Sequence, residues 1–127
     1  MADQRPLRLG DLQLKIMKVL WKLGTASVAR VHQELRADRL AYTTVATMLR
    51  KMEARGLVGH EEQGRRFIYA PAVSEEEVNR HTTADLVDRL FEGSLAEAVS
   101  HLLQTRDVSP EELDRLERLI HDRKLRP

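Results

Sequence analysis

Apolar side chains recur with helical spacing through most of the first half of this chain. Between residues 42 and 55 they lie three and four positions apart, so Val45, Met48, Leu49 and Met52 share one face of an α-helix. The same spacing predicts a helix over residues 11–23. Its buried stripe would consist of Leu12, Ile16, Val19, Leu20 and Leu23. A shorter helix is expected from Ser27, a favoured N-cap residue, to about residue 35.

The pattern changes after Gly56, a residue suited to the left-handed turn that ends a helix. Two short apolar runs, 57–58 and 67–69, flank a polar stretch from His60 to Arg66 that contains Gly64. This pattern predicts a β-hairpin whose tip presents Arg65 and Arg66. Residues 25–26 are expected to add a third strand. Three helices followed by a hairpin is the order of elements in a winged helix-turn-helix.

Three helix starts follow in the last part of the chain. Ser74, Ser94 and Ser109 are each followed by Glu three residues later, which is the spacing of a capping box. The predicted helices run over 75–91, 95–105 and 110–124, and Gly93 breaks the first. The predicted fold is therefore mainly α with a small β-hairpin. A winged-helix DNA-binding domain at residues 1–72 would precede a three-helix dimerisation domain at residues 73–127.

The three tail helices carry more apolar surface than they can cover among themselves. We therefore expect two copies of the tail to form a homodimer. The alternative is that the tail folds back onto the first domain. The residues expected at the dimer interface are Leu86, Leu90, Phe91, Leu95, Val99, Leu102, Leu103, Leu113, Leu116, Leu119 and Ile120.

The polar side of the predicted helix at 42–55 suits double-stranded DNA. It carries Thr43, Thr47, Arg50 and Lys51, with Thr44 on its flank. In the major groove, threonine can form a hydrogen bond with a base edge and arginine can bind guanine. The hairpin arginines can reach the flanking DNA backbone. The alternative is an ordinary amphipathic helix with a solvated charged face.

Charge is distributed unevenly along the chain. Residues 1–70 contain 13 Lys and Arg against 7 Asp and Glu, a net charge of +6, whereas residues 71–127 contain 8 against 13, a net charge of −5. A basic first part favours a polyanionic partner for that part alone. The polar arm at residues 1–7, with Arg5 and the following Arg8, could also touch phosphate; the alternative is a disordered, solvated arm. Aromatic residues make up 4% of the chain, which disfavours stacking on single-stranded nucleic acid.

The sequence gives little support to other classes of function. It has no cysteine, no phosphate-binding glycine motif and no nucleophile elbow, so we expect neither an enzyme nor a cofactor. His81 and Asp85 have a helical spacing that could share a metal, with Asp88 beside them, but a surface pair is favoured and no metal site is predicted. No apolar run could span a bilayer and residues 1–8 lack a signal-peptide core, so we expect a cytoplasmic location.

Several segments resemble the penicillinase-repressor family, the BlaI/MecI type of bacterial transcriptional repressor. The similar segments are Leu9-Gly10-Asp11-Leu12, Ile16-Met17-Lys18-Val19-Leu20-Trp21, Val31-His32-Gln33-Glu34-Leu35, Tyr42-Thr43-Thr44-Val45-Ala46-Thr47-Met48-Leu49, Gly56-Leu57-Val58 and Tyr69-Ala70-Pro71. The resemblance implies a dimer that binds a palindromic operator and represses nearby genes, with antibiotic-resistance or stress genes as the implied class.

The resemblance also implies roles for individual residues. Thr43, Thr44 and Thr47 would face bases, Tyr42 would lie in the same DNA-binding set, and the cations Arg50, Lys51, Arg65 and Arg66 would contact mostly backbone. In one branch of the family a membrane protease antirepressor cuts an Asn-Phe bond, and His101-Leu102 aligns with that bond here. A copper-responsive branch uses paired C-terminal cysteines, which this chain lacks.

A second class of function stays open at this point. A winged-helix adaptor that binds a protein partner, and dimerises through its tail, would share the same pattern of elements. The two hypotheses differ in one property: only the repressor should bind duplex DNA with an affinity that falls steeply as salt rises.

Overall fold

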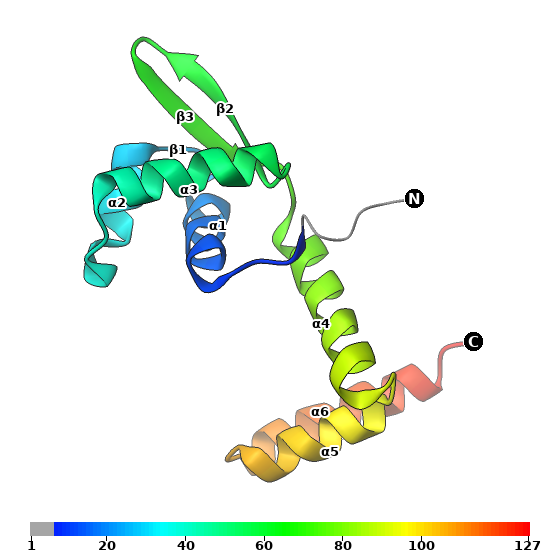
Figure 1. Ribbon diagram of the computed structural model, residues 1–127. Coiled ribbons are helices and arrows are strands. Elements are labelled where there is room, and N and C mark those ends of the chain that lie inside the picture. Colours follow the sequence, from blue (N-terminus) through cyan, green and yellow to red (C-terminus); the bar gives the residue numbers. More distant parts are fainter. Residues whose placement is uncertain (1–6) are drawn as a thin grey trace. The chain divides into compact units, whose positions relative to one another are not determined.

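The computed structural model describes residues 7–127, so the arm expected to contact phosphate through Arg5 lies outside the described residues. The chain divides into two compact units, one ending at Asp85 and the other running from Leu86 to Pro127. This division falls inside helix α4 (Glu75–Phe91), which is coloured light green in Figure 1. The expected division into a winged-helix domain at residues 1–72 and a dimerisation domain at residues 73–127 stays a prediction.

The first three helices form where the apolar spacing predicts them. They are α1 (Asp11–Leu23), α2 (Val28–Glu34) and α3 (Tyr42–Ala54), and a 3₁₀ turn, η2 (Arg36–Asp38), precedes α3. Ser27 caps α2, because its hydroxyl oxygen accepts a hydrogen bond from the Arg30 backbone N–H at 3.1 Å. Gly56 has a φ of +82°, so it supplies the left-handed turn after α3.

A three-stranded antiparallel sheet, in the order β1-β3-β2, completes the winged helix. Its strands are β1 (Ala26–Ser27), β2 (Val58–Gln63) and β3 (Arg66–Pro71), and Figure 1 shows β2 and β3 as the long hairpin. The third strand expected near residues 25–26 is confirmed, although it lies one residue later, at Ala26–Ser27. The prediction of a polar tip from His60 to Arg66 was wrong: β2 continues to Gln63, which pairs with Arg66, and only Gly64 and Arg65 form the turn. Backbone pairing holds these polar residues in the ladder although their side chains are exposed.

One hydrophobic core holds the first unit together. Its fully buried members come from all three helices and the sheet: Ile16, Met17, Leu20, Val31, Val45, Leu49, Met52 and Leu57, with Tyr69 of β3 at 1% exposure. Met17 was missing from the predicted stripe of α1. Trp21 is half-buried against this core, and its indole N–H donates to the Val73 carbonyl at 2.9 Å, which ties α1 to the segment before α4.

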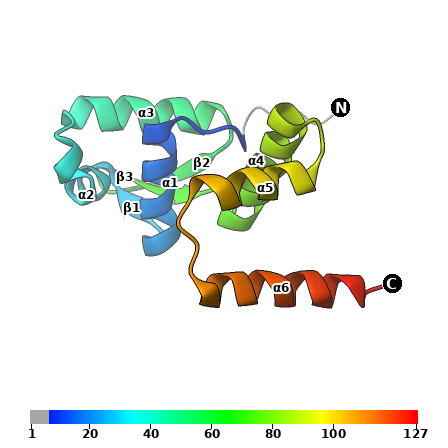
Figure 2. The same ribbon diagram turned by 90° about the horizontal axis from the view of Figure 1, so that it is seen from below.

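The second unit contains the end of α4 together with α5 (Leu95–Thr105) and α6 (Pro110–Lys124), joined by residues 106–109 (Figure 2). The predicted capping serines act as expected. The Ser94 and Ser109 hydroxyl oxygens accept from the backbone N–H groups of Glu97 and Glu112, both at 3.1 Å. Among residues 86–127, only Ala98 is buried. A single copy of this unit therefore leaves most of its leucine side chains in contact with water.

Candidate nucleic-acid interface

The two sides of α3 differ in burial as the sequence pattern predicts. Val45, Leu49 and Met52 are fully buried, whereas Thr43, Thr44, Arg50 and Lys51 are exposed and Thr47 is half-buried. The apolar side thus packs into the core that α1, α2 and the sheet also form, and the side with hydroxyls and cations is the more exposed one within the first unit. The orientation of α3 is confirmed, while the contacts of these side chains with DNA stay a prediction.

Hydrogen bonds and ring contacts order the polar side of α3. The Arg50 guanidinium donates to the Thr47 hydroxyl at 3.3 Å, so these two side chains, three residues apart, contact each other on the same face of the helix. At the start of α3, the Tyr42 ring meets the His32 ring edge-on, with centroids 5.8 Å apart. A ring nitrogen of His32 lies 2.8 Å from the Leu40 carbonyl oxygen, which ties α2 to the loop before α3.

The far end of α3 is anchored to the beginning of the described chain. The Arg55 guanidinium donates to the Gln13 side-chain oxygen at 2.9 Å and to the Arg8 carbonyl at 2.7 Å. The Gln13 amide in turn lies 3.6 Å from the Met48 sulfur. Arg55 thus differs from Arg50 and Lys51 in role: it fixes the position of α3 on α1 rather than pointing into solvent.

The wing is held against α3 at its base. Nδ1 of His60 lies 2.7 Å from Oε1 of Glu53, and the His60 ring stacks on Phe67 at 4.2 Å. Arg65 and Arg66 are exposed at the opposite end of the hairpin. The structure therefore brings two cations to the end of a hairpin whose base is fastened to the candidate recognition helix.

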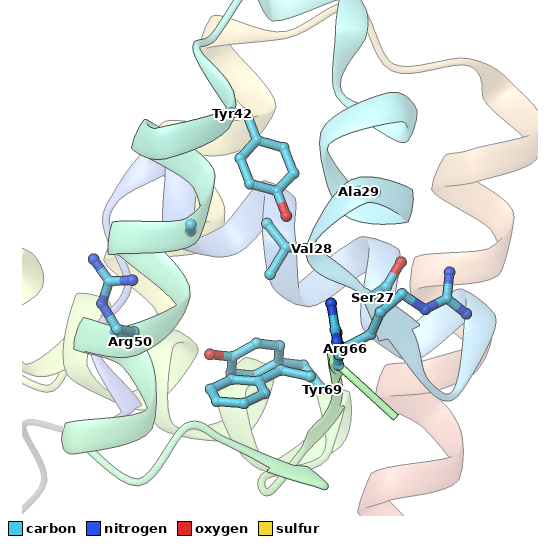
Figure 3. Close-up of a pocket in the computed structure, with 10 residues that line it drawn as sticks. Ser27, Val28, Ala29, Tyr42, Arg50, Arg66 and Tyr69 are labelled. Carbon is cyan, nitrogen blue, oxygen red and sulfur yellow. The ribbon is translucent and has the colours of Figure 1, made fainter. Parts of the chain in front are cut away.

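A groove lies between these elements, and Figure 3 shows the residues that line it. Sequence reasoning had singled out four of its lining residues, namely Tyr42, Arg50, Arg65 and Arg66. It missed the others, which are Ser27, Val28, Ala29, Ala46, Phe67 and Tyr69. Thr43, Thr44, Thr47 and Lys51 do not line the groove. The missed residues belong to separate stretches of the chain, so no local pattern in the sequence marks them as neighbours.

The residues proposed for dimerisation carry most of the exposed apolar surface of the second unit. Exposed side chains among them are Leu86, Leu90, Leu95, Leu102, Leu103, Leu113, Leu119 and Ile120, whereas Phe91, Val99 and Leu116 are partly covered. His101 is exposed and its ring lies 5.9 Å from that of Phe91. Leu102, beside it, is 49% exposed on α5, so the bond aligned with the family's cleavage position lies on an accessible helix.

Other kinds of site find little support in the described part of the chain. Residues 7–127 contain no group of three or more His, Asp or Glu side chains that could hold a metal ion. Nε2 of His81 is buried and has no hydrogen-bond partner among those residues. None of the helices formed by the described residues is long and apolar enough to cross a membrane.

Comparison with known proteins gives a family match over nearly the whole chain. The family model described as penicillinase repressor matches residues 9–122. The penicillinase repressor of Bacillus licheniformis is 28% identical over 120 residues, which are 94% of each chain. The transcriptional regulator BlaI of Mycobacterium tuberculosis is 34% identical over 116 residues, which cover 89% of this chain and 83% of that protein.

Solved structures agree on the fold. The solution structure of the DNA-binding domain of the repressor BlaI superposes with a TM-score of 0.53 at 29% identity, and covers 61% of this chain and 93% of that domain. The crystal structure of overoxidized AbfR bound to DNA has a TM-score of 0.52 at 21% identity, and covers 80% of this chain and 78% of that one. The similarity to AbfR supports only the winged-helix fold.

Proposed function

Because this chain belongs to the penicillinase-repressor family, we propose that it is a DNA-binding transcriptional repressor. Members of this family are repressors and not enzymes. The observation that carries the proposal is the burial of α3: Val45, Leu49 and Met52 are buried in the core, while Thr43, Thr44, Arg50 and Lys51 are exposed and Thr47 is half-buried. A repressor acts on the chromosome, so we place the protein in the cytoplasm.

Helix α3 would enter the major groove with its threonines toward the bases. Thr43, Thr44 and Thr47 offer hydroxyls to base edges and methyl groups to thymine. Tyr42, Arg50 and Lys51 border this surface, and the cations would bind backbone phosphates. Arg65 and Arg66, at the end of the wing, would hold the flanking phosphates or the minor groove. The net charge of +6 over residues 1–70 supports binding of a polyanion by this part of the chain.

Two copies would pair through the second unit. Each leucine that passes from water into an interface contributes roughly 2 kcal/mol, and eight of the named apolar side chains are exposed in the single copy. A twofold dimer presents two α3 helices, so its operator would be an inverted repeat. We expect the regulated genes to lie near the operator and to belong to the antibiotic-resistance or stress class.

The release step in this chain would differ from cleavage of an Asn-Phe bond. A membrane protease antirepressor acting here would have to accept His101-Leu102, which lies on the exposed surface of α5. The intact helix would also have to open locally before its backbone could enter a protease, because cleavage requires an extended segment. Incubating the chain with such a protease and mapping the fragments by mass would test this step.

Selection from a pool of random duplexes by the full chain would test the proposed function. An inverted repeat should emerge, and its affinity for the chain should fall steeply as salt rises. The double variant Thr43→Ala/Thr47→Ala, which lacks two of the proposed base contacts, should select no common sequence. A parent chain that enriches no sequence and binds duplex DNA without salt dependence would contradict the proposal and favour a protein-binding adaptor.

A further inference from the structure

Tyr69 combines a buried ring with a hydroxyl that makes no hydrogen bond to the described part of the chain. Its side chain is 1% exposed, and its ring lies 5.4 Å from that of His60 and 6.5 Å from that of Phe67. Within residues 7–127 its hydroxyl makes no hydrogen bond, yet it is not among the polar atoms sealed from solvent. The small exposed part of Tyr69 is therefore at its oxygen, which opens into the groove that the residue lines.

The rest of the groove is lined by hydrogen-bond donors and apolar side chains. Arg50 of α3 lines the groove on one side, and Arg65 and Arg66 of the wing line it on the other. The Ser27 oxygen accepts from the Arg30 backbone N–H, so the Ser27 hydroxyl hydrogen remains available to donate. In Figure 3 the hydroxyl of Tyr69 points toward α3, the helix that carries Arg50. Val28, Ala29 and Ala46 supply apolar surface in the same groove.

Resting on the proposed function, we propose that this groove binds one phosphodiester of the DNA backbone, and that the Tyr69 hydroxyl donates a hydrogen bond to it. Phosphate oxygens only accept hydrogen bonds, and the groove offers guanidinium and hydroxyl donors to them. The apolar side chains are suited to the adjoining deoxyribose. A phosphate held between α3 and the wing would fix the register of both elements on the duplex.

The surroundings of Tyr69 keep its hydroxyl in the donor form. Burial raises the pKa of Tyr69 above its ordinary value, the nearby Glu53 carboxylate raises it further, and Arg50 acts in the opposite direction. The phenol therefore stays protonated at neutral pH. Because the ring is packed in the core, its hydroxyl is already in place before DNA arrives and loses little rotational freedom on binding.

Tyr69→Phe in the full chain tests the proposal, since it removes one oxygen and leaves the ring in the core. Affinity for the duplex that the parent selects should fall on the order of tenfold, which is the usual contribution of a hydrogen bond to a charged oxygen. The salt dependence of binding should not change, because no charge is lost. Thr83→Val, which removes an exposed hydroxyl outside the groove, is the matched control and should bind like the parent.

A second measurement locates the contact on DNA. Neutral methylphosphonate groups are placed one at a time along the selected duplex. At one position in each half-site, the substitution should weaken DNA binding by the parent. At that position it should also largely remove the difference in affinity between the parent and Tyr69→Phe. Both chains should unfold at similar temperatures, which separates loss of the contact from loss of the fold.

Several outcomes would overturn the proposal. A parent chain that selects a duplex, combined with a Tyr69→Phe variant of equal affinity, removes Tyr69 from the interface while leaving the repressor function standing. A methylphosphonate scan in which the two chains differ equally at every position does the same. If inorganic phosphate shifts the Tyr69 ring resonances while Tyr69→Phe binds DNA normally, the groove holds a free anion instead. A parent that selects no duplex contradicts the proposed function itself.

Discussion

Nδ1 of His60, on β2, lies 2.7 Å from Oε1 and 2.9 Å from Oε2 of Glu53, near the end of α3. The same imidazole stacks on Phe67 of β3 with an angle of 16° between the planes. One side chain therefore joins both strands of the wing to the candidate recognition helix. The direction in which the wing leaves α3 depends on this contact as well as on the backbone at Gly56.

His60→Ala should weaken DNA binding by releasing the wing, although His60 lies away from its tip. We expect the loss to be smaller when Arg65 and Arg66 are already alanine, with a coupling free energy of about 1 kcal/mol. A double-mutant cycle on DNA affinity measures this coupling. Glu53→Gln, which keeps an oxygen acceptor for the ring nitrogen, serves as the milder control. Equal losses in both backgrounds would show that His60 does not act through the wing.

Arg65→Ala should weaken binding to all duplexes about equally. Removing a phosphate contact lowers affinity without changing sequence choice, and it should reduce the salt slope by about 1. Mobility shifts on selected and scrambled duplexes at several salt concentrations measure both quantities. Arg118→Ala is a matched control, because it removes an exposed arginine from α6 in the second unit. An unchanged salt slope would argue against a phosphate contact at Arg65.

Thr47→Ala should relax sequence choice instead. A lost base contact lowers affinity for the best duplex by about 1–3 kcal/mol, while nonspecific duplexes bind nearly as before. Thr47 also accepts a hydrogen bond from Arg50, so Thr47→Ser, which keeps the hydroxyl, separates the loss of that bond from the loss of a methyl contact. Repeating the duplex selection with each variant measures the change in sequence preference. Identical selected sequences would place Thr47 outside the base contacts.

Leu119→Asp should dissociate the proposed dimer. Leu119 is 56% exposed in the single copy, so a carboxylate there is tolerated by the monomer and penalised only in an interface that excludes water. Leu116 is partly covered within its own unit, which makes it the less specific site for this test. Sedimentation of Leu119→Asp beside the parent measures the effect. A variant that remains dimeric would move the interface elsewhere.

Acid should loosen the start of α4. The Ser74 backbone N–H donates to Oε1 of Glu77 at 2.9 Å, and this bond, with the Ser74 side chain, holds the pKa of Glu77 below its ordinary value of 4.5. Since the folded pKa is depressed, the stabilising contribution is present above 4.5 and is lost as pH falls through the folded value. Helicity followed by circular dichroism should therefore change less on acidification in Glu77→Gln than in Glu75→Gln, which alters a neighbouring carboxylate outside the capping box.

The local sequence determined where helices begin and end. The 3.6-residue period of Val45, Leu49 and Met52 predicts both the helix and its buried side, because neighbouring turns of one helix set that pattern. The spacing from Ser to Glu marks the N-caps of the tail helices for the same reason, since the bonded atoms lie within one turn. From these signals the six α-helices of residues 7–127 and the exposed side of α3 could be predicted.

Only the tertiary structure decided how separate segments meet. The strand β2 runs through polar residues to Gln63 because its backbone pairs with β3, and pairing partners are not encoded in a local period. The contact between Glu53 and His60, the groove shared by Ser27, Arg50 and Arg66, and the burial of Tyr69 with its oxygen left open all join different elements. Such neighbours arise when the hydrophobic core closes, so they depend on the packing of the whole unit and not on the spacing of residues along any one helix or strand.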